Sequence, residues 1–252
     1  MKLIQSLVAV TMLLSALTAV SAEQLTVAVA ANVKFAFDEL SVEFKKSSGV
    51  EIVGVFASSG KINAQIKSGA PFDVFMSADM DFPEALHKEG LAIAAPRVYA
   101  RGVLVLWTLH PYDLSQGMKI LANAEIRKVA IANPRLAPYG RESLRAIEYF
   151  KLREVVEPKL VFGESIGQVN QYIDVQAVEI GFTAKSVVLA PQMLGRGKWI
   201  EVPAESYQPI DQGIVILKHG AQTNADASKK FLAFMGSAKA RAMLEKFGYI
   251  LP

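Results

Sequence analysis

Apolar and polar positions along the chain form two kinds of pattern, one typical of strands and one typical of helices. The run LTVAVA at 25–30 is typical of a buried strand. In the next segment, 33–46, apolar residues recur at spacings of four, three and four, with charged residues between them, which predicts an amphipathic helix. The same succession of a strand-like run and a helix-like segment continues to the end of the chain.

This alternation predicts an α/β fold. Strands are expected at 25–30, 50–56, 72–78, 101–107, 128–134, 159–163, 179–184 and 213–217. Helices are expected at 33–46, 60–69, 81–90, 140–152, 165–176, 185–193, 227–235 and 237–247. Because helices of this length separate the strands, the strands should form mostly parallel sheets that are covered on both faces.

Residues 1–22 are interpreted as a secretory signal peptide rather than as part of the fold. Lys2 supplies a positive start, an apolar stretch follows, and Val20-Ser21-Ala22 is a small-residue cleavage site. We therefore expect cleavage near Ala22 and a protein of the periplasm or the medium. Since the sequence has no cysteine, a lipid-anchored mature end is excluded and the core must stabilise the protein without disulfides.

The charge pattern excludes several classes of function. The 27 Lys and Arg residues nearly balance the 24 Asp and Glu residues, and no basic run concentrates the charge, so nucleic-acid binding has no support. No segment after the signal peptide approaches the apolar length of a membrane span. The three histidines are far apart and form no ligand motif, so neither a metal cation nor a cofactor is expected.

Chemistry is expected where a strand leads into a helix. Ligands of open parallel sheets bind beyond the carboxyl ends of the strands, and helix N-termini offer unpaired N–H groups that suit anions. These junctions lie at 31–32, 57–60, 138–140, 164–167 and 183–185. Two of them carry a cation directly after a glycine, Lys61 and Arg141. Either an anion sits near these cations, or their long side chains extend into solvent.

Two enzyme motifs compete with a binding function. The glycine spacing at 54–61 fails the pattern of a Walker phosphate loop, which excludes that class of ATPase. The segment 163–167 does fit G-x-S-x-G, and Ser165, Asp211 and His219 follow in the order of an α/β-hydrolase triad. A secreted serine hydrolase that uses Ser165 therefore stays open. The other interpretation is that Ser165 caps the helix that follows it.

Five stretches resemble a known family. They are FASSGKINAQIKSGAPFDVFMSAD (56–79), TVAVAANV (26–33), ANPRLAPYG (132–140), GESIGQV (163–169) and KKFLAFMGSAKARAMLEKFGY (229–249). Over essentially the whole chain after the signal peptide, the sequence resembles the periplasmic molybdate-binding proteins of molybdenum ABC transporters, which are type II solute-binding proteins. The resemblance implies two α/β lobes, each with a mostly parallel sheet, that close over a tetrahedral oxyanion and catalyse no reaction.

The resemblance also implies a ligand site and partners. By position, it places the ligand at Ala31, Asn32, Ser59, Tyr139 and Ile166. Ala184 stands where some relatives have a tyrosine, so Tyr139 would replace the missing hydroxyl, and Asn32 would donate through its amide. The implied partners are molybdate or tungstate and the membrane permease of an ABC importer, with the binding protein itself a monomer.

Hydrogen-bond chemistry suits this ligand. Molybdate and tungstate are fully deprotonated near neutral pH, so their oxygens only accept hydrogen bonds and match a pocket of neutral donors. Sulfate has the same bonding character and is smaller, so cavity size should discriminate between them. A receptor for sulfate, thiosulfate or a phosphonate therefore stays open as an alternative.

The lobe boundaries can be predicted as well. We expect residues 23–102 in lobe 1, which 218–252 complete, and residues 103–217 in lobe 2, hinge strands included. The strands RGVLVLW (101–107) and QGIVIL (212–217) are expected to cross between the lobes and act as the hinge.

Overall fold

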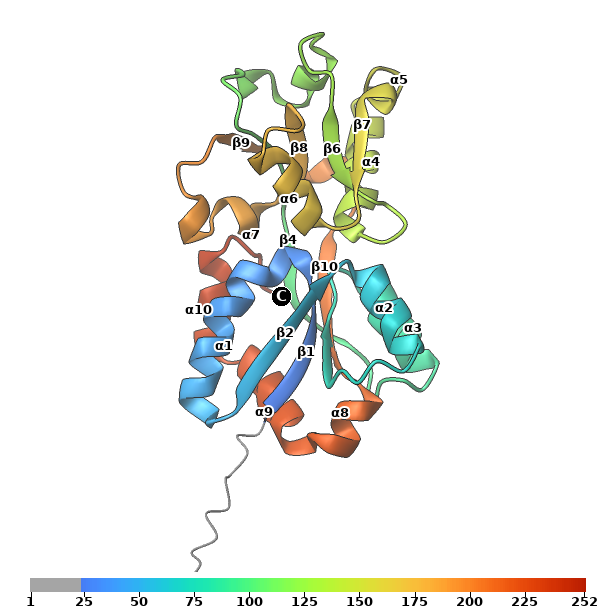
Figure 1. Cartoon of the computed structure of the whole chain (residues 1–252), viewed down its shortest axis with the longest axis vertical. Coiled ribbons are helices and arrows are strands. Elements are labelled where there is room, and N and C mark those ends of the chain that lie inside the picture. The colour runs from blue at the N-terminus through green and yellow to red at the C-terminus, as the bar shows by residue number, and fades with distance from the viewer. Residues whose placement is uncertain (1–23) are drawn as a thin grey trace, which may run out of the picture.

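The computed structural model describes residues 24–252, so the predicted signal peptide lies outside the described residues. The described chain forms two lobes stacked along its long axis (Figure 1), each built on one five-stranded sheet with helices around it. The predicted α/β class is therefore confirmed. Among residues 24–252, no helix has the length and apolar character that crossing a membrane requires.

The first lobe is built on the strand order β2-β1-β3-β10-β4. Strands β2 and β3 pair in parallel with β1, whereas β10 runs antiparallel between β3 and β4. The strands are β1 (Gln24–Ala30), β2 (Glu51–Ala57), β3 (Val74–Met76), β4 (Arg97–Gly102) and β10 (Ile210–Ile216).

Helices cover both faces of the first sheet, with α1 and α10 on one side and α2 and α3 on the other (Figure 1). The predicted apolar stripe of α1 is buried, and the helix ends at Gly49, whose φ of 75° suits a glycine cap. The helical segments are η1 (Ala31–Val33), α1 (Lys34–Ser48), α2 (Ser59–Lys67), α3 (Asp81–Lys88), α8 (Lys218–Thr223), α9 (Ala225–Met235) and α10 (Ala238–Lys246).

The second lobe repeats this plan with the strand order β7-β6-β8-β5-β9. Strands β7 and β8 pair in parallel with β6, and β5 runs antiparallel between β8 and β9. The strands are β5 (Leu104–Thr108), β6 (Val129–Ala132), β7 (Leu160–Gly163), β8 (Ile180–Ala184) and β9 (Lys198–Glu201). The helical segments are η2 (Leu114–Ala122), α4 (Pro138–Tyr149), α5 (Arg153–Val156), η3 (Glu157–Lys159), α6 (Ile166–Asp174), α7 (Lys185–Val188), η4 (Pro191–Met193) and η5 (Ala204–Ser206).

The chain passes between the two sheets twice. The predicted strand at 101–107 is interrupted at Val103, where β4 ends and β5 begins in the other sheet. The return runs through residues 202–209, ahead of the strand that we expected to cross. Because β10 pairs with β3 and β4, it belongs to the first sheet, whereas the predicted boundaries place it with the hinge strands of the second lobe. The extent of each lobe as a moving body stays a prediction.

Candidate functional site

A small cavity lies where the two lobes meet. It is small, so it has room for a compact group and none for an extended substrate. It is lined by Ala30, Ala31, Asn32, Ser58, Ser59, Ala78, Ala137, Pro138, Tyr139 and Ile166. The structure thus brings all five predicted site residues together, and none of the lining side chains carries a charge.

Four helix starts converge on this cavity. The lining residues include the first-turn residues of η1, α2, α4 and α6. The first N–H groups of a helix have no partner within it and carry the positive end of the helix dipole. Helix α4 begins with Pro138, whose missing N–H costs nothing at that position. The cavity is therefore surrounded by positive partial charge without a full cation, which suits an anion.

Two neighbouring serines at the start of α2 line the cavity and differ in their hydrogen-bond partners. The Ser59 hydroxyl accepts a hydrogen bond from the Ala78 N–H at 2.9 Å, so its own hydrogen remains to be donated. Ser58 Oγ is buried and has no hydrogen-bond partner within residues 24–252. Buried polar atoms rarely lack a partner, so a ligand atom is the expected partner of Ser58. Neither Ser58 nor Ala78 was identified from the sequence, although both lie in the motif at 56–79.

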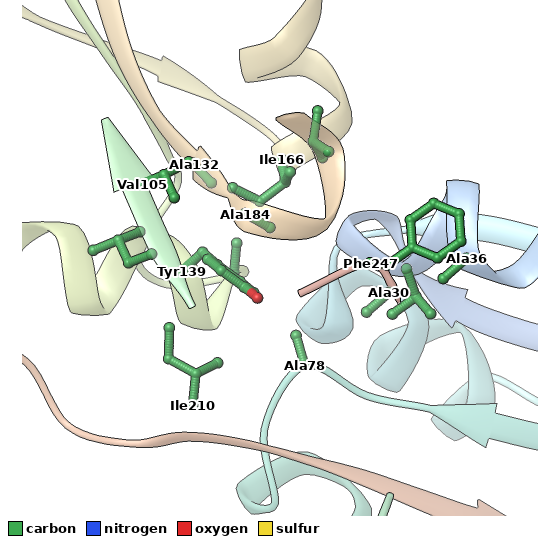
Figure 2. Packing of buried hydrophobic residues seen from close by; sticks show 14 of the residues in the cluster. Ala30, Ala36, Ala78, Val105, Ala132, Tyr139, Ile166, Ala184, Ile210 and Phe247 are labelled. Atoms are coloured by element: carbon green, nitrogen blue, oxygen red, sulfur yellow. The ribbon is translucent and has the colours of Figure 1, made fainter. Parts of the chain in front are cut away.

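Tyr139 brings a hydroxyl from the second lobe. Its side chain is 1% exposed, and its oxygen accepts a hydrogen bond from Gln212 Nε2 at 3.2 Å. Figure 2 shows this hydroxyl pointing across the junction toward Ala78 of the first lobe. Burial, followed by the neighbouring tyrosines, raises the pKa of Tyr139 well above its ordinary value. The group is therefore a neutral O–H donor at physiological pH.

Asn32 has a different role from the expected one. Its Nδ2 donates to Gln212 Oε1 at 3.1 Å and to the Tyr249 hydroxyl at 3.2 Å. Because an amide nitrogen carries two hydrogens, none remains for a ligand. The side chain, which was expected to donate to the oxyanion, instead ties the start of η1 to β10 and to the C-terminal segment after α10. What Asn32 can offer a ligand is its backbone N–H.

The lobes are in contact on both sides of the cavity. The Gly60 N–H of α2 donates to the carbonyl of Leu136 at 2.8 Å, and the Ser186 hydroxyl of α7 donates to the carbonyl of Asn32 at 2.8 Å. Each bond joins a backbone group of one lobe to the other lobe. The structure is therefore a closed form, in which the two lobes contact each other beside the cavity.

Both cations noticed in the sequence pair across the junction. Lys61 Nζ lies 2.7 Å from Glu164 of the second lobe. Arg141, on α4, lies 3.2 Å from Asp79 and 3.4 Å from Asp81 of the first lobe. Neither cation lines the cavity, so they do not hold the anion directly and they do not simply extend into solvent. They link the lobes in the closed form.

The structure does not assemble the hydrolase triad. Ser165 caps α6, since its hydroxyl accepts from the Gln168 N–H. His219 bonds to the buried Asp73 at 3.1 Å, at the far end of the first lobe. Asp211 pairs with Arg101 at 2.6 Å. Each of the three residues that would form the triad thus has a separate partner, and the capping interpretation of Ser165 is the one that the geometry supports.

Buried tyrosines around the site make the fold sensitive to alkali. Burial raises the pKa values of Tyr99, Tyr139 and Tyr249 above the ordinary value of about 10. The folded chain therefore keeps protons that the unfolded chain releases. Their contribution to the free energy of unfolding should be constant below about pH 10 and fall above it, by up to about 1.4 kcal/mol per pH unit for each such tyrosine.

Urea unfolding between pH 8 and 11, followed alongside tyrosinate absorbance, measures this loss. Tyr99→Phe should reduce the slope of stability against pH, because it removes one titrating group. If all seven tyrosines titrate together near pH 10 in the folded protein, the assignment is wrong.

Comparison with known proteins identifies the family to which the chain belongs. The chain matches the family of bacterial extracellular solute-binding proteins over residues 25–250. It is 36% identical to the molybdate-binding protein ModA of Azotobacter vinelandii over 233 residues, 92% of this chain and 91% of that protein. It is 35% identical to the molybdate-binding protein ModA of Rhodobacter capsulatus, over 91% of this chain and 89% of that protein.

A solved structure agrees with the sequence comparison. The periplasmic molybdate-binding protein of Azotobacter vinelandii superimposes with a TM-score of 0.85 at 34% identity. The superposition covers 90% of this chain and 99% of that one.

Proposed function

Because the chain belongs to the family of bacterial extracellular solute-binding proteins, we propose that it is the molybdate-binding component of an ABC importer. That family is one of binding proteins rather than of enzymes. The cavity between the lobes is the proposed ligand site, and molybdate or tungstate is the proposed ligand. The protein would act as a monomer in the periplasm, need no cofactor, and deliver its ligand to a membrane permease.

One observation carries the choice of a fully deprotonated oxyanion. The cavity is lined by hydroxyl groups and helix N-termini and by no charged side chain. A carboxylate in such a cavity would repel a dianion, and a lysine or arginine would bring a charge whose burial is costly. Neutral donors satisfy every oxygen of an anion that can only accept.

The expected donors suffice for tight binding. In this proposal Ser58, Ser59 and Tyr139 donate through their hydroxyls, and first-turn N–H groups supply the rest. Each hydrogen bond to a charged group contributes about 1.5–3 kcal/mol net. Four to six of them sum to about 6–18 kcal/mol, a range that includes the roughly 8–12 kcal/mol of micromolar to nanomolar binding.

A screen of oxyanions tests the proposal. The purified protein, without its first 22 residues, is heated with molybdate, tungstate, sulfate, thiosulfate, phosphate or a phosphonate, and Kd values follow from calorimetry. Molybdate and tungstate should each raise the Tm by several degrees, because a ligand that binds only the folded state stabilises it. A Tm shift with sulfate or thiosulfate but none with molybdate would contradict the choice of ligand.

A further inference from the structure

We propose that Gln212 is a positioning residue that turns the Tyr139 hydroxyl hydrogen toward the ligand, so that this side of the cavity favours an anion oxygen that carries no proton. The inference deepens the proposed function and rests on it. Gln212 lies on β10, directly after the segment that returns from the second lobe, and it is fully buried. It does not line the cavity but bonds two residues that do, Asn32 and Tyr139, and its proposed effect on the ligand acts through the bond with Tyr139.

The orientation of the Gln212 amide follows from its neighbours. Its Oε1 accepts from the Tyr99 hydroxyl at 2.7 Å and from Asn32 Nδ2 at 3.1 Å. In the structure the Asn32 nitrogen faces the oxygen of Gln212, so the Gln212 nitrogen faces the other way. That nitrogen lies 3.2 Å from the Tyr139 oxygen and donates to it. The hydrogen of the Tyr139 hydroxyl is thereby left for a group in the cavity.

The last residue of β4, Gly102, leaves room for the contact between Gln212 and Tyr139. A Cβ atom on Gly102 would lie 2.0 Å from the Tyr139 hydroxyl and 2.5 Å from Gln212 Nε2. Only glycine permits both side chains to meet above that strand. The pair is therefore accommodated by three elements, α4 of the second lobe and β4 and β10 of the first.

The hydroxyl of Ser59 is oriented in the same way as that of Tyr139. Its oxygen accepts from the Ala78 N–H, as the Tyr139 oxygen accepts from Gln212. A protein donor thus occupies an acceptor position on each of these hydroxyls, and both are set to donate. A singly protonated anion such as hydrogen phosphate needs an acceptor for its own hydrogen. Its protonated oxygen is therefore disfavoured at these two positions, and Ser58 is the lining hydroxyl that, within residues 24–252, still has free acceptor positions. Molybdate carries no hydrogen, so each of its oxygens can accept a hydrogen bond from these hydroxyls.

A double-mutant cycle tests whether Gln212 acts through Tyr139. Gln212→Met removes the amide at similar volume, and Tyr139→Phe removes the hydroxyl. Calorimetry at pH 8 uses the oxyanion that the wild-type protein binds most tightly, so that a wrong choice of molybdate leaves the test intact. We expect each single change to raise Kd at least fivefold, and the double variant to match Tyr139→Phe within twofold.

Losses that multiply in the double variant would overturn the proposal, since they would give Gln212 an effect independent of Tyr139. An unchanged Kd in Gln212→Met would overturn it as well. Gln222→Met, at an exposed position of α8, is the matched control and should change nothing. A wild-type protein that binds none of the oxyanions would overturn this inference together with the proposed function.

A second variant tests selectivity and distinguishes positioning from a merely structural role. In Gln212→Glu the carboxylate accepts the Tyr139 hydrogen, so the phenol oxygen faces the cavity as an acceptor. The ratio of the Kd for hydrogen phosphate to that for molybdate at pH 8 should fall at least tenfold. A general loosening of the fold would weaken the binding of both anions by the same factor and leave the ratio of the Kd values unchanged. An unchanged ratio would therefore overturn the proposed role in selectivity.

Discussion

Gly60→Val should abolish tight ligand binding and leave the fold intact. A Cβ atom on Gly60 would lie 2.9 Å from Leu136 Cα and 3.0 Å from the Leu136 carbonyl oxygen, both backbone atoms of the opposite lobe that cannot turn aside. It would also lie 3.1 Å from the ring tip of Phe82 in its own lobe, a side chain that can shift. A branched side chain there would hold the lobes apart and prevent the Gly60 N–H from reaching Leu136. Because only the closed form encloses the ligand, we expect at least a hundredfold loss of affinity, or about 2.7 kcal/mol.

Calorimetry measures that loss, and small-angle X-ray scattering with saturating ligand should show a more extended particle than the wild-type protein gives. Gly236→Val is the matched control. A Cβ atom at Gly236 would meet only the Ala233 carbonyl oxygen, at 3.5 Å and within the same lobe. Gly60→Val binding the ligand within threefold of the wild-type Kd would show that the lobes need not meet at this point.

Ser59→Ala should weaken ligand binding by about 1.5–3 kcal/mol, a ten- to 150-fold rise in Kd. The change removes one hydroxyl donor from the cavity. It also leaves the buried Ala78 N–H without the oxygen that it now bonds, so the free energy of unfolding should fall by about 1 kcal/mol. Calorimetry and urea unfolding measure the two losses separately.

Ser58→Ala is the comparison that separates the two serines. Ser58 Oγ has no partner within residues 24–252, so its loss should weaken ligand binding without lowering the stability of the ligand-free protein. A variant that is destabilised yet binds with wild-type affinity would place Ser58 among structural residues and leave the ligand to Ser59 and Tyr139.

Local patterns were sufficient to predict most of the fold. The apolar stripe at 33–44 and the run at 25–30 became α1 and β1 within a few residues, because period and burial agree there. Departures occur where local patterns do not determine the structure. Pro191 interrupts the helix expected at 185–193, so that α7 ends at Val188. The short, half-exposed edge strand β9 has little apolar pattern to identify it.

The site was predicted in part, because it depends on contacts between distant segments. Strand-to-helix junctions located Ser59 and Tyr139, since the chemistry of a helix start is local. The use of the Asn32 amide by Gln212 could not be foreseen, because those residues are 180 positions apart. For the same reason, the partners of Lys61 and Arg141 became known only when the two lobes were seen together.

The position of β10 in the first sheet bears on the order in which the chain can fold. All five strands of the second sheet lie within residues 104–201, one continuous stretch. The first sheet, in contrast, has a gap between β3 and β4 until β10 is available. During synthesis, β3 and β4 therefore keep unpaired apolar edges until β10 emerges, after the whole second sheet has been made. We expect such a chain to depend on holding factors until its end is released.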